Sequence, residues 1–177
     1  MSGPGREVNA VVNGVTVNRW VPNRRLLSDF LRTDLGLIGT KVSCELQVCG
    51  VCSVLVDGEP VSSCTYLAVD IDGRTVETVE GLAGPDGLHP LQQSFVDNFA
   101  LQCGFCTSGF LMMSKHLLEE NPTPSEEEVK HHLEGNICRC TGYRPIVEAV
   151  LEVAHGKDAE AGHGLDPIGA QAREAHR

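Results

Sequence analysis

Cationic side chains and long apolar runs are scarce in this sequence. The 177 residues contain 14 Lys and Arg against 24 Asp and Glu, which gives a formal net charge of -10 at pH 7. Nucleic-acid binding depends on Lys and Arg neutralising phosphates, so we expect no nucleic-acid partner. No stretch approaches the run of about 18 apolar residues that marks a membrane span. The N-terminus MSGPGREVNA also lacks the apolar core of a secretory signal, so we expect a cytoplasmic protein without a membrane span.

Aromatic residues are also few, whereas cysteine is plentiful. Phe, Trp and Tyr make up 5% of the chain, so few large rings are available to fill a core. Small cores of this kind need additional stabilisation, such as disulfides or bound metals. The chain has eight cysteines. Because thiols are kept reduced in the cytoplasm, clustered cysteines there are more often metal ligands than disulfides.

The N-terminal half has the two-residue hydrophobic period of β-strands, interrupted by Asn-Gly and Asp-Gly turn signals. This pattern predicts strands over residues 7–12, 15–20, 53–56, 60–63 and 75–79, the last as a member of a further strand pair. A short helix is expected before the third strand, because one helical face would carry Leu26, Leu27, Phe30, Leu31 and Leu35. Residues 36–52 contain glycines and cysteines without periodicity, so we expect a loop ordered by whatever the cysteines bind.

The hydrophobic period changes to about 3.6 after residues 81–87, a segment with three glycines and one proline. One apolar stripe runs from Leu88 to Phe99, and Ser125 with Glu128 forms a capping box that begins a later helix. Four short helices are expected in this C-terminal part of the chain.

These patterns predict an α+β chain with two domains. We place a β-rich domain at residues 1–82 and a four-helix domain at residues 88–155. Residues 156–177 are rich in Gly, Ala and charge, so we expect a tail that is flexible or bound to a partner.

The first four cysteines have the spacing of an iron–sulfur site. Cys44, Cys49 and Cys52 follow the C-x4-C-x2-C pattern of plant-type [2Fe-2S] proteins, and Cys64 supplies a fourth thiolate. Gly50 lies between two of these cysteines, where a Cβ would keep backbone N–H groups away from cluster sulfur. The pattern predicts one [2Fe-2S] cluster, with the backbone of Gly50 beside it.

The other four cysteines form a second candidate site. Cys103 and Cys106 lie in LQCGFC, and Cys138 and Cys140 lie in GNICRC, each pair just before an expected helix. Two helix N-termini would place partial positive charge beside an anionic cluster. A second [2Fe-2S] cluster is therefore predicted here.

Two other interpretations of the cysteines remain open at this point. Cys103-x2-Cys106 is also a common half of a zinc site, which would make the chain a zinc-stabilised interaction module. A disulfide framework would require an oxidising compartment, which the N-terminus does not support.

The motifs together resemble the iron–sulfur small subunit of molybdenum hydroxylases, the family of xanthine dehydrogenase, aldehyde oxidase and aerobic carbon monoxide dehydrogenase. The resemblance spans residues 7 to about 155. The matching segments are residues 39–41, 44–52, 54–58, 63–65, 102–107 and 135–143. This resemblance implies a β-grasp, ferredoxin-like domain followed by an all-α four-helix [2Fe-2S]-binding domain.

The resemblance also implies a function. The chain would be a non-catalytic electron-transfer subunit of an oxidoreductase complex, between a large subunit with a molybdopterin-type molybdenum cofactor and a medium subunit with FAD. The cluster on Cys103, Cys106, Cys138 and Cys140 would lie nearest molybdenum, and the cluster on the first four cysteines would face the flavin. A free-standing two-cluster electron carrier is the alternative.

Further details rest on the resemblance alone. Gln102 and Cys140 match family positions that lie against the pterin, so they are candidate cofactor contacts. A dimer of heterotrimers is common in the family. Nothing in these residues touches the substrate, so carbon monoxide, aldehydes, purines and other N-heterocycles are all compatible with this chain.

Overall fold

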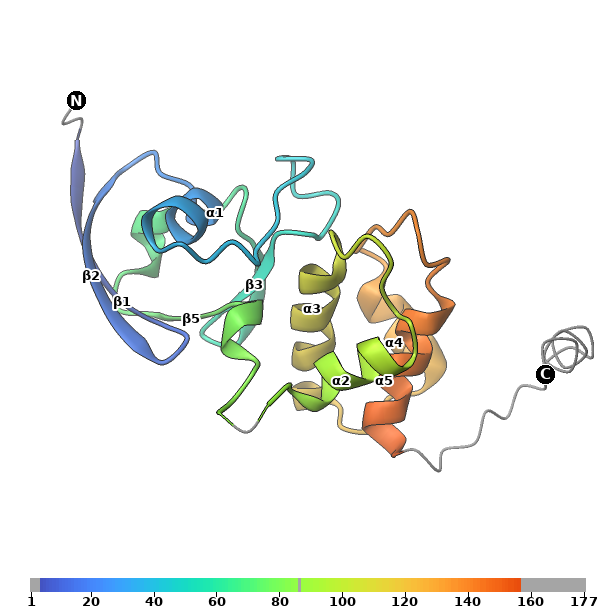
Figure 1. The fold of residues 1–177 in the computed structure, drawn as a ribbon. Coiled ribbons are helices and arrows are strands. Elements are labelled where there is room, and N and C mark those ends of the chain that lie inside the picture. The colour runs from blue at the N-terminus through green and yellow to red at the C-terminus, as the bar shows by residue number, and fades with distance from the viewer. Residues whose placement is uncertain (1–3, 86, 157–177) are drawn as a thin grey trace, which may run out of the picture.

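A computed structural model describes residues 4–85 and 87–156, and it has a sheet-based half and a helical half packed side by side (Figure 1). The tail predicted over residues 156–177 lies outside the described residues, apart from Gly156. Within the described part of the chain, no helix combines the length and the hydropathy that crossing a bilayer requires.

Five strands form one mixed sheet in the N-terminal half, in the order β2-β1-β5-β3-β4. The strands are β1 Gly5–Val12, β2 Val15–Pro22, β3 Ser53–Val56, β4 Glu59–Ser62 and β5 Thr75–Glu77. β1 with β2 and β3 with β4 form antiparallel hairpins, while β5 pairs parallel to β1 and antiparallel to β3. Asn13-Gly14 and Asp57-Gly58 have positive φ at both positions, as type I′ turns require, so the two predicted hairpins are confirmed.

The strand pair expected near residues 75–79 is only partly confirmed. β5 has three residues, and the segment before Asp72-Gly73 is a 3-10 helix, η2 Ala68–Ile71. The N–H of Asn9 donates to Oδ1 of Asp72 at 2.9 Å, and the N–H of Gly73 donates to the carbonyl of Asn9 at 2.7 Å. These bonds direct the chain alongside β1, so Asp72-Gly73 leads β5 into the middle of the sheet and does not close a hairpin.

A short helical segment covers one face of the sheet, as predicted. α1 Leu27–Asp29 continues into a π-helical turn, η1 Phe30–Asp34, and Gly36 follows with φ +73°. Leu27, Phe30 and Leu31 are fully buried. They share an apolar core with Val8, Ala10, Val12, Val21, Val54, Val56, Ala68, Val69, Ile71 and Val76.

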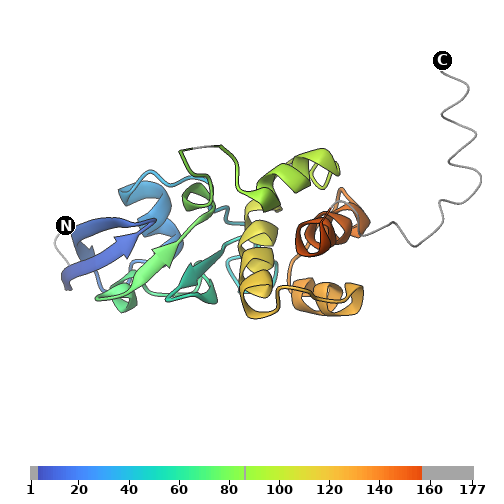
Figure 2. The same ribbon diagram turned by 90° about the horizontal axis from the view of Figure 1, so that it is seen from below.

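Four helices form the C-terminal half, as predicted (Figure 2). They are α2 Pro90–Asp97, α3 Thr107–Glu120, α4 Glu126–Leu133 and α5 Arg144–His155. Their buried side chains make a second core, which Leu55 of β3 joins from the sheet. Every residue of β3 is buried, because one face of this strand meets the first core and the other meets α3. The limits 1–82 and 88–155 for the two domains remain predictions.

The apolar stripe expected from Leu88 to Phe99 is only half confirmed. Leu91 and Phe95 are buried, but Leu88 is 53% exposed and Phe99 is 82% exposed. α2 ends at Asp97, and Phe99 has φ +53°. The left-handed backbone turns the Phe99 side chain away from the helix face that the period assumed.

The capping box at the start of α4 is confirmed and gives a stability prediction. Ser125 Oγ accepts the N–H of Glu128 at 3.3 Å, and Glu128 Oε2 accepts the N–H of Ser125 at 2.7 Å. We expect Ser125→Ala to lower the free energy of unfolding by about 1 kcal/mol at neutral pH, because the first turn loses an acceptor. The measurement is the urea midpoint followed by circular dichroism.

The loss of unfolding free energy in Ser125→Ala should also depend on pH. Hydrogen bonds from the Ser125 hydroxyl and N–H lower the pKa of Glu128, so this stabilisation is present above the usual Glu pKa and disappears as pH falls through the folded-state pKa. The difference between the Ser125→Ala variant and the unmodified chain should therefore shrink on acidification. Thr123→Ala in the same loop removes no cap and serves as the control; an equal loss from both variants would contradict the assignment.

Candidate metal centres

The first four cysteines meet where the loop of residues 36–52 joins the second hairpin. Cys44 and Cys49 lie in the loop, Cys52 directly precedes β3, and Cys64 follows β4. Ser63 Oγ donates to the carbonyl of Cys52 at 2.7 Å and ties the two ends of the hairpin together. Cys49, Cys52 and Cys64 are buried, whereas Cys44 is half-buried. The hairpin thus folds the chain back and brings Cys64 beside Cys52 at the end of the loop.

Backbone N–H groups converge on the sulfur of Cys44. The N–H groups of Leu46 and Val48 each lie 3.4 Å from Cys44 Sγ. Glu45 and Gln47 have φ of +55° and +59°, so residues of alternating handedness make a concave nest of N–H groups. These bonds, led by that from Leu46, lower the pKa of Cys44 to about 6. The loop is therefore built to surround an anionic sulfur.

Burial makes the thiols of Cys64 and Cys106 favour the neutral form until a metal ion is present. Burial raises the pKa of Cys64 to about 11, although the N–H of Gln47 opposes this. Burial likewise raises the pKa of Cys106 to about 12, and contact with Cys138 adds to the effect. Because a coordinated thiol is deprotonated outright, a bound metal would remove this cost.

The start of the loop is held by charged side chains. Arg32 donates to the carbonyl of Ile38 at 3.1 Å, and Lys41 Nζ donates to the same carbonyl at 2.8 Å. Glu80 Oε1 accepts the N–H of Gly39 at 2.6 Å. Lys41 therefore supports the backbone of the loop, a role that its position in the sequence did not reveal.

The second four cysteines meet at the starts of α3 and α5. Cys106 is the N-cap of α3, and Cys138 and Cys140 lie in the loop that leads to α5. The Sγ atoms of Cys103 and Cys140 are 3.6 Å apart, and the side chains of Cys106 and Cys138 are also in contact. Two segments more than thirty residues apart thus deliver four thiols to one place.

Thr141 and Tyr143 hold Cys138 in position. The Thr141 hydroxyl lies 3.1 Å from Cys138 Sγ, and the Tyr143 hydroxyl accepts the N–H of Cys138 at 3.0 Å. Burial opposes ionisation of Cys138, but the hydroxyl and N–H of Thr141 more than offset it and lower the pKa. Sequence reasoning assigned no role to these two residues. Their presence in the matching segment 135–143 was the only signal that could have identified them.

Within each group the cysteines approach one another as pairs. The pairs are Cys44 with Cys49, Cys52 with Cys64, Cys103 with Cys140, and Cys106 with Cys138. Two thiolates on one tetrahedral metal with bonds of about 2.3 Å lie about 3.8 Å apart, close to the 3.6 Å between Cys103 and Cys140. Two such pairs suit a two-iron cluster in which each iron takes two thiolates. Among residues 4–85 and 87–156, no three Cys, His, Asp or Glu side chains are placed to hold one metal ion.

The second cysteine group opens to the surface of the chain. Cys103 and Cys140 are exposed, and so is the neighbouring Gln102. Phe99 is 82% exposed and Phe105 is 45% exposed on the same segment. Exposed aromatic side chains of this kind are typical of surfaces that bind a partner.

The structure shows a second requirement for glycine at position 50, which the sequence alone did not reveal. Its φ is +69°, and a Cβ there would lie 2.7 Å from Cγ of Asn136 and from the carbonyl oxygen of Gly135. The glycine therefore lets the loop of the first cysteine group pack against the loop of the second.

Comparisons with known proteins identify two iron–sulfur domain families in this chain. The family described as "2Fe-2S iron-sulfur cluster binding domain" matches residues 10–82, and the family described as "[2Fe-2S] binding domain" matches residues 78–151. Each matched range contains one of the two cysteine groups. The predicted α+β fold with two [2Fe-2S]-binding domains is confirmed.

Whole proteins and a solved structure are similar over most of their length. The 6-hydroxypseudooxynicotine dehydrogenase complex subunit beta of Paenarthrobacter nicotinovorans is 55% identical over 148 residues, which cover 83% of this chain and 92% of that protein. Caffeine dehydrogenase subunit gamma of Pseudomonas sp. strain CBB1 is 45% identical over 150 residues, 83% of this chain and 90% of that protein. A chain of quinoline 2-oxidoreductase from Pseudomonas putida 86 superposes with a TM-score of 0.83 at 46% identity, covering 86% of this chain and 94% of that chain.

Proposed function

Because the chain belongs to the family of iron–sulfur small subunits of molybdenum hydroxylases, we propose that it carries electrons from a molybdenum site to FAD within a heteromeric oxidoreductase. Substrate chemistry takes place on the partner, and this chain supplies no catalytic residue. It holds and separates two redox centres.

The observation that carries the proposal is the convergence of eight cysteines into two groups of four, one in each half of the fold. A bound [2Fe-2S] cluster accepts one electron and passes it on. We propose that Cys44, Cys49, Cys52 and Cys64 hold one cluster and that Cys103, Cys106, Cys138 and Cys140 hold the other. The nest of N–H groups on Cys44 would raise the reduction potential of the first cluster.

The orientation of the chain between its partners is also a proposal. The exposed surface around Cys103 and Cys140 supports contact with the large molybdenum subunit, with Gln102 and Cys140 against the molybdopterin. At the first group, Leu46 is 73% exposed and Val48 is 61% exposed beside the half-buried Cys44. These apolar side chains support contact with the medium FAD subunit at the opposite cluster.

Three finer expectations remain predictions: assembly as a dimer of heterotrimers, location in the cytoplasm, and the substrate. The relatives include a nicotine hydroxylase subunit, caffeine and nicotinate dehydrogenase subunits, and an aldehyde oxidoreductase. We propose no choice among these substrates, because the substrate site would lie on the partner subunit.

Metal analysis of the full chain, purified without air, tests the proposal. We expect iron and acid-labile sulfide in equal amounts, with two distinct EPR signals after reduction. Zinc without labile sulfide would instead establish a zinc-stabilised module. Co-purification with a large molybdenum subunit and a flavin subunit is also expected; a chain that keeps both clusters but elutes alone at low concentration would support the free-standing carrier.

A further inference from the structure

The loops of the two cysteine groups touch each other through Asn136. This side chain is 4% exposed, and its Nδ2 donates to the carbonyl of Gly50 at 3.1 Å. Gly50 directly follows Cys49, and Asn136 lies two residues before Cys138. A single buried amide therefore connects the two segments that carry cysteines of different groups.

A backbone bond beside Asn136 strengthens the connection. The N–H of Ile137 donates to the carbonyl of Cys49 at 3.0 Å. Ile137 is the neighbour of Cys138, so a cysteine of the first group is bonded to the chain of the second with no intervening element. The loops of the two groups are thus hydrogen-bonded directly to each other.

Gly109 brings α3 into the same contact. A Cβ on Gly109 would lie 2.3 Å from the carbonyl oxygen of Gly50, 3.0 Å from Cα of Val51 and 3.1 Å from Nδ2 of Asn136. Real Cβ atoms do not approach backbone so closely, so only glycine allows this spacing. Because Cys106 is the N-cap of α3, the approach of this helix to Gly50 also positions that cysteine.

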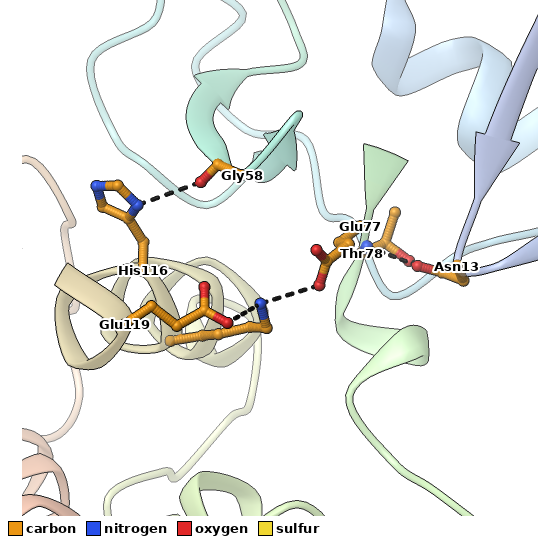
Figure 3. Close-up of polar contacts among 7 residues, drawn as sticks. Asn13, Gly58, Glu77, Thr78, His116 and Glu119 are labelled. Carbon is orange, nitrogen blue, oxygen red and sulfur yellow. Dashed lines mark hydrogen bonds and ion pairs between the residues drawn. The ribbon is translucent and has the colours of Figure 1, made fainter. Parts of the chain in front are cut away.

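Other contacts between the two halves lie further along α3. Lys115 Nζ pairs with Glu77 at 3.0 Å, and Nδ1 of His116 lies 3.2 Å from the carbonyl of Gly58 (Figure 3). These contacts join α3 to the sheet, but neither touches a neighbour of a cysteine. They therefore provide a comparison for the contact at Asn136.

We propose that Asn136, packed between Gly50 and Gly109, is a positioning residue that sets the separation and relative orientation of the two [2Fe-2S] clusters. The inference rests on the proposed function. Asn136, Gly50 and Gly109 carry no charge, so they act on spacing and leave the field at each cluster nearly unchanged. The readout must accordingly be one that depends on the distance between the clusters.

Magnetic interaction between the two reduced clusters provides this readout, because dipolar coupling falls with the cube of their separation. The full chain, purified anaerobically with its iron and fully reduced, is expected to show EPR signals split by this interaction. In Asn136→Ala we expect both signals to keep their g-values while the splitting decreases. In Asn136→Leu we expect the same decrease, because an uncharged side chain of similar size without an N–H group cannot donate to Gly50.

His116→Gln is the matched control, since it alters a contact between the halves away from the cysteines and should leave the splitting unchanged. Gly109→Ala is the second variant, and its added Cβ should reduce the splitting by forcing α3 away from Gly50.

Unchanged splitting in the Asn136 variants would overturn the inference, as would an equal decrease in His116→Gln. Loss of a whole cluster in both Asn136 variants would also overturn it, because Asn136 would then shape one site and not the spacing. Failure of the proposed function is distinct, since the unmodified chain would then lack two iron–sulfur signals.

Discussion

Replacing Cys106 with alanine is expected to remove one [2Fe-2S] cluster and to leave the other in place. The substitution deletes one of the two thiols of the Cys106–Cys138 pair, so one iron would lose half of its protein ligands. We expect iron and labile sulfide per chain to fall by half and one of the two EPR signals to disappear. Iron and sulfide analysis of the anaerobically purified chain measures the first change, and EPR measures the second.

Cys52→Ala is the matched variant in the first group, where it breaks the pair with Cys64. It should also halve the iron content but should abolish the other EPR signal. Complementary loss would assign each signal to one half of the chain. If either variant lost all of its iron, or if both lost the same signal, the assignment of four cysteines to each cluster would be wrong.

Independent loss is expected because each cysteine group has its own apolar core. Phe30 and Leu31 belong to the core of the sheet half, whereas Phe110 and Ile146 belong to the core of the helical half. β3 lies between the two cores and contributes side chains to both. A half whose cluster is lost can therefore loosen without exposing the core of the other half.

Much of the architecture could be predicted because local signals agreed with it. Asn13-Gly14 and Asp57-Gly58 adopt the positive φ values that their residue types favour, and Ser125 with Glu128 makes the expected cap. The division of the cysteines into two groups also followed from local spacing. In the turns and the cap, the residues that determine the structure are close together in the sequence.

The rest depends on contacts that sequence spacing does not encode. β5 lies between β1 and β3, because residues 72–73 bond to Asn9 far away in the sequence. The pairing of Cys103 with Cys140 depends on how α3 and α5 pack. Gly50 is required by its distant neighbour Asn136, whereas its immediate surroundings suggested only an approach to cluster sulfur. Such long-range contacts become visible only once the two halves are placed together.

Replacing Phe110 with alanine should have the largest effect on stability. Phe110 is 1% exposed, and its ring meets that of Tyr143 edge to face at a centroid distance of 6.3 Å. The hydroxyl of Tyr143 in turn accepts the N–H of Cys138. Removing the ring leaves a cavity beneath a residue that holds a cysteine in place, so we expect a loss of about 3–5 kcal/mol in the free energy of unfolding.

The loss should be concentrated in the helical half. During urea unfolding of Phe110→Ala, the EPR signal abolished by Cys106→Ala should disappear at a lower urea concentration than the signal abolished by Cys52→Ala. Phe105→Ala is the control, because this phenylalanine is 45% exposed and should change stability by no more than about 0.5 kcal/mol. Equal destabilisation by the two substitutions would contradict the packing of Phe110, and simultaneous loss of both signals would show that the cores of the two halves unfold as one unit.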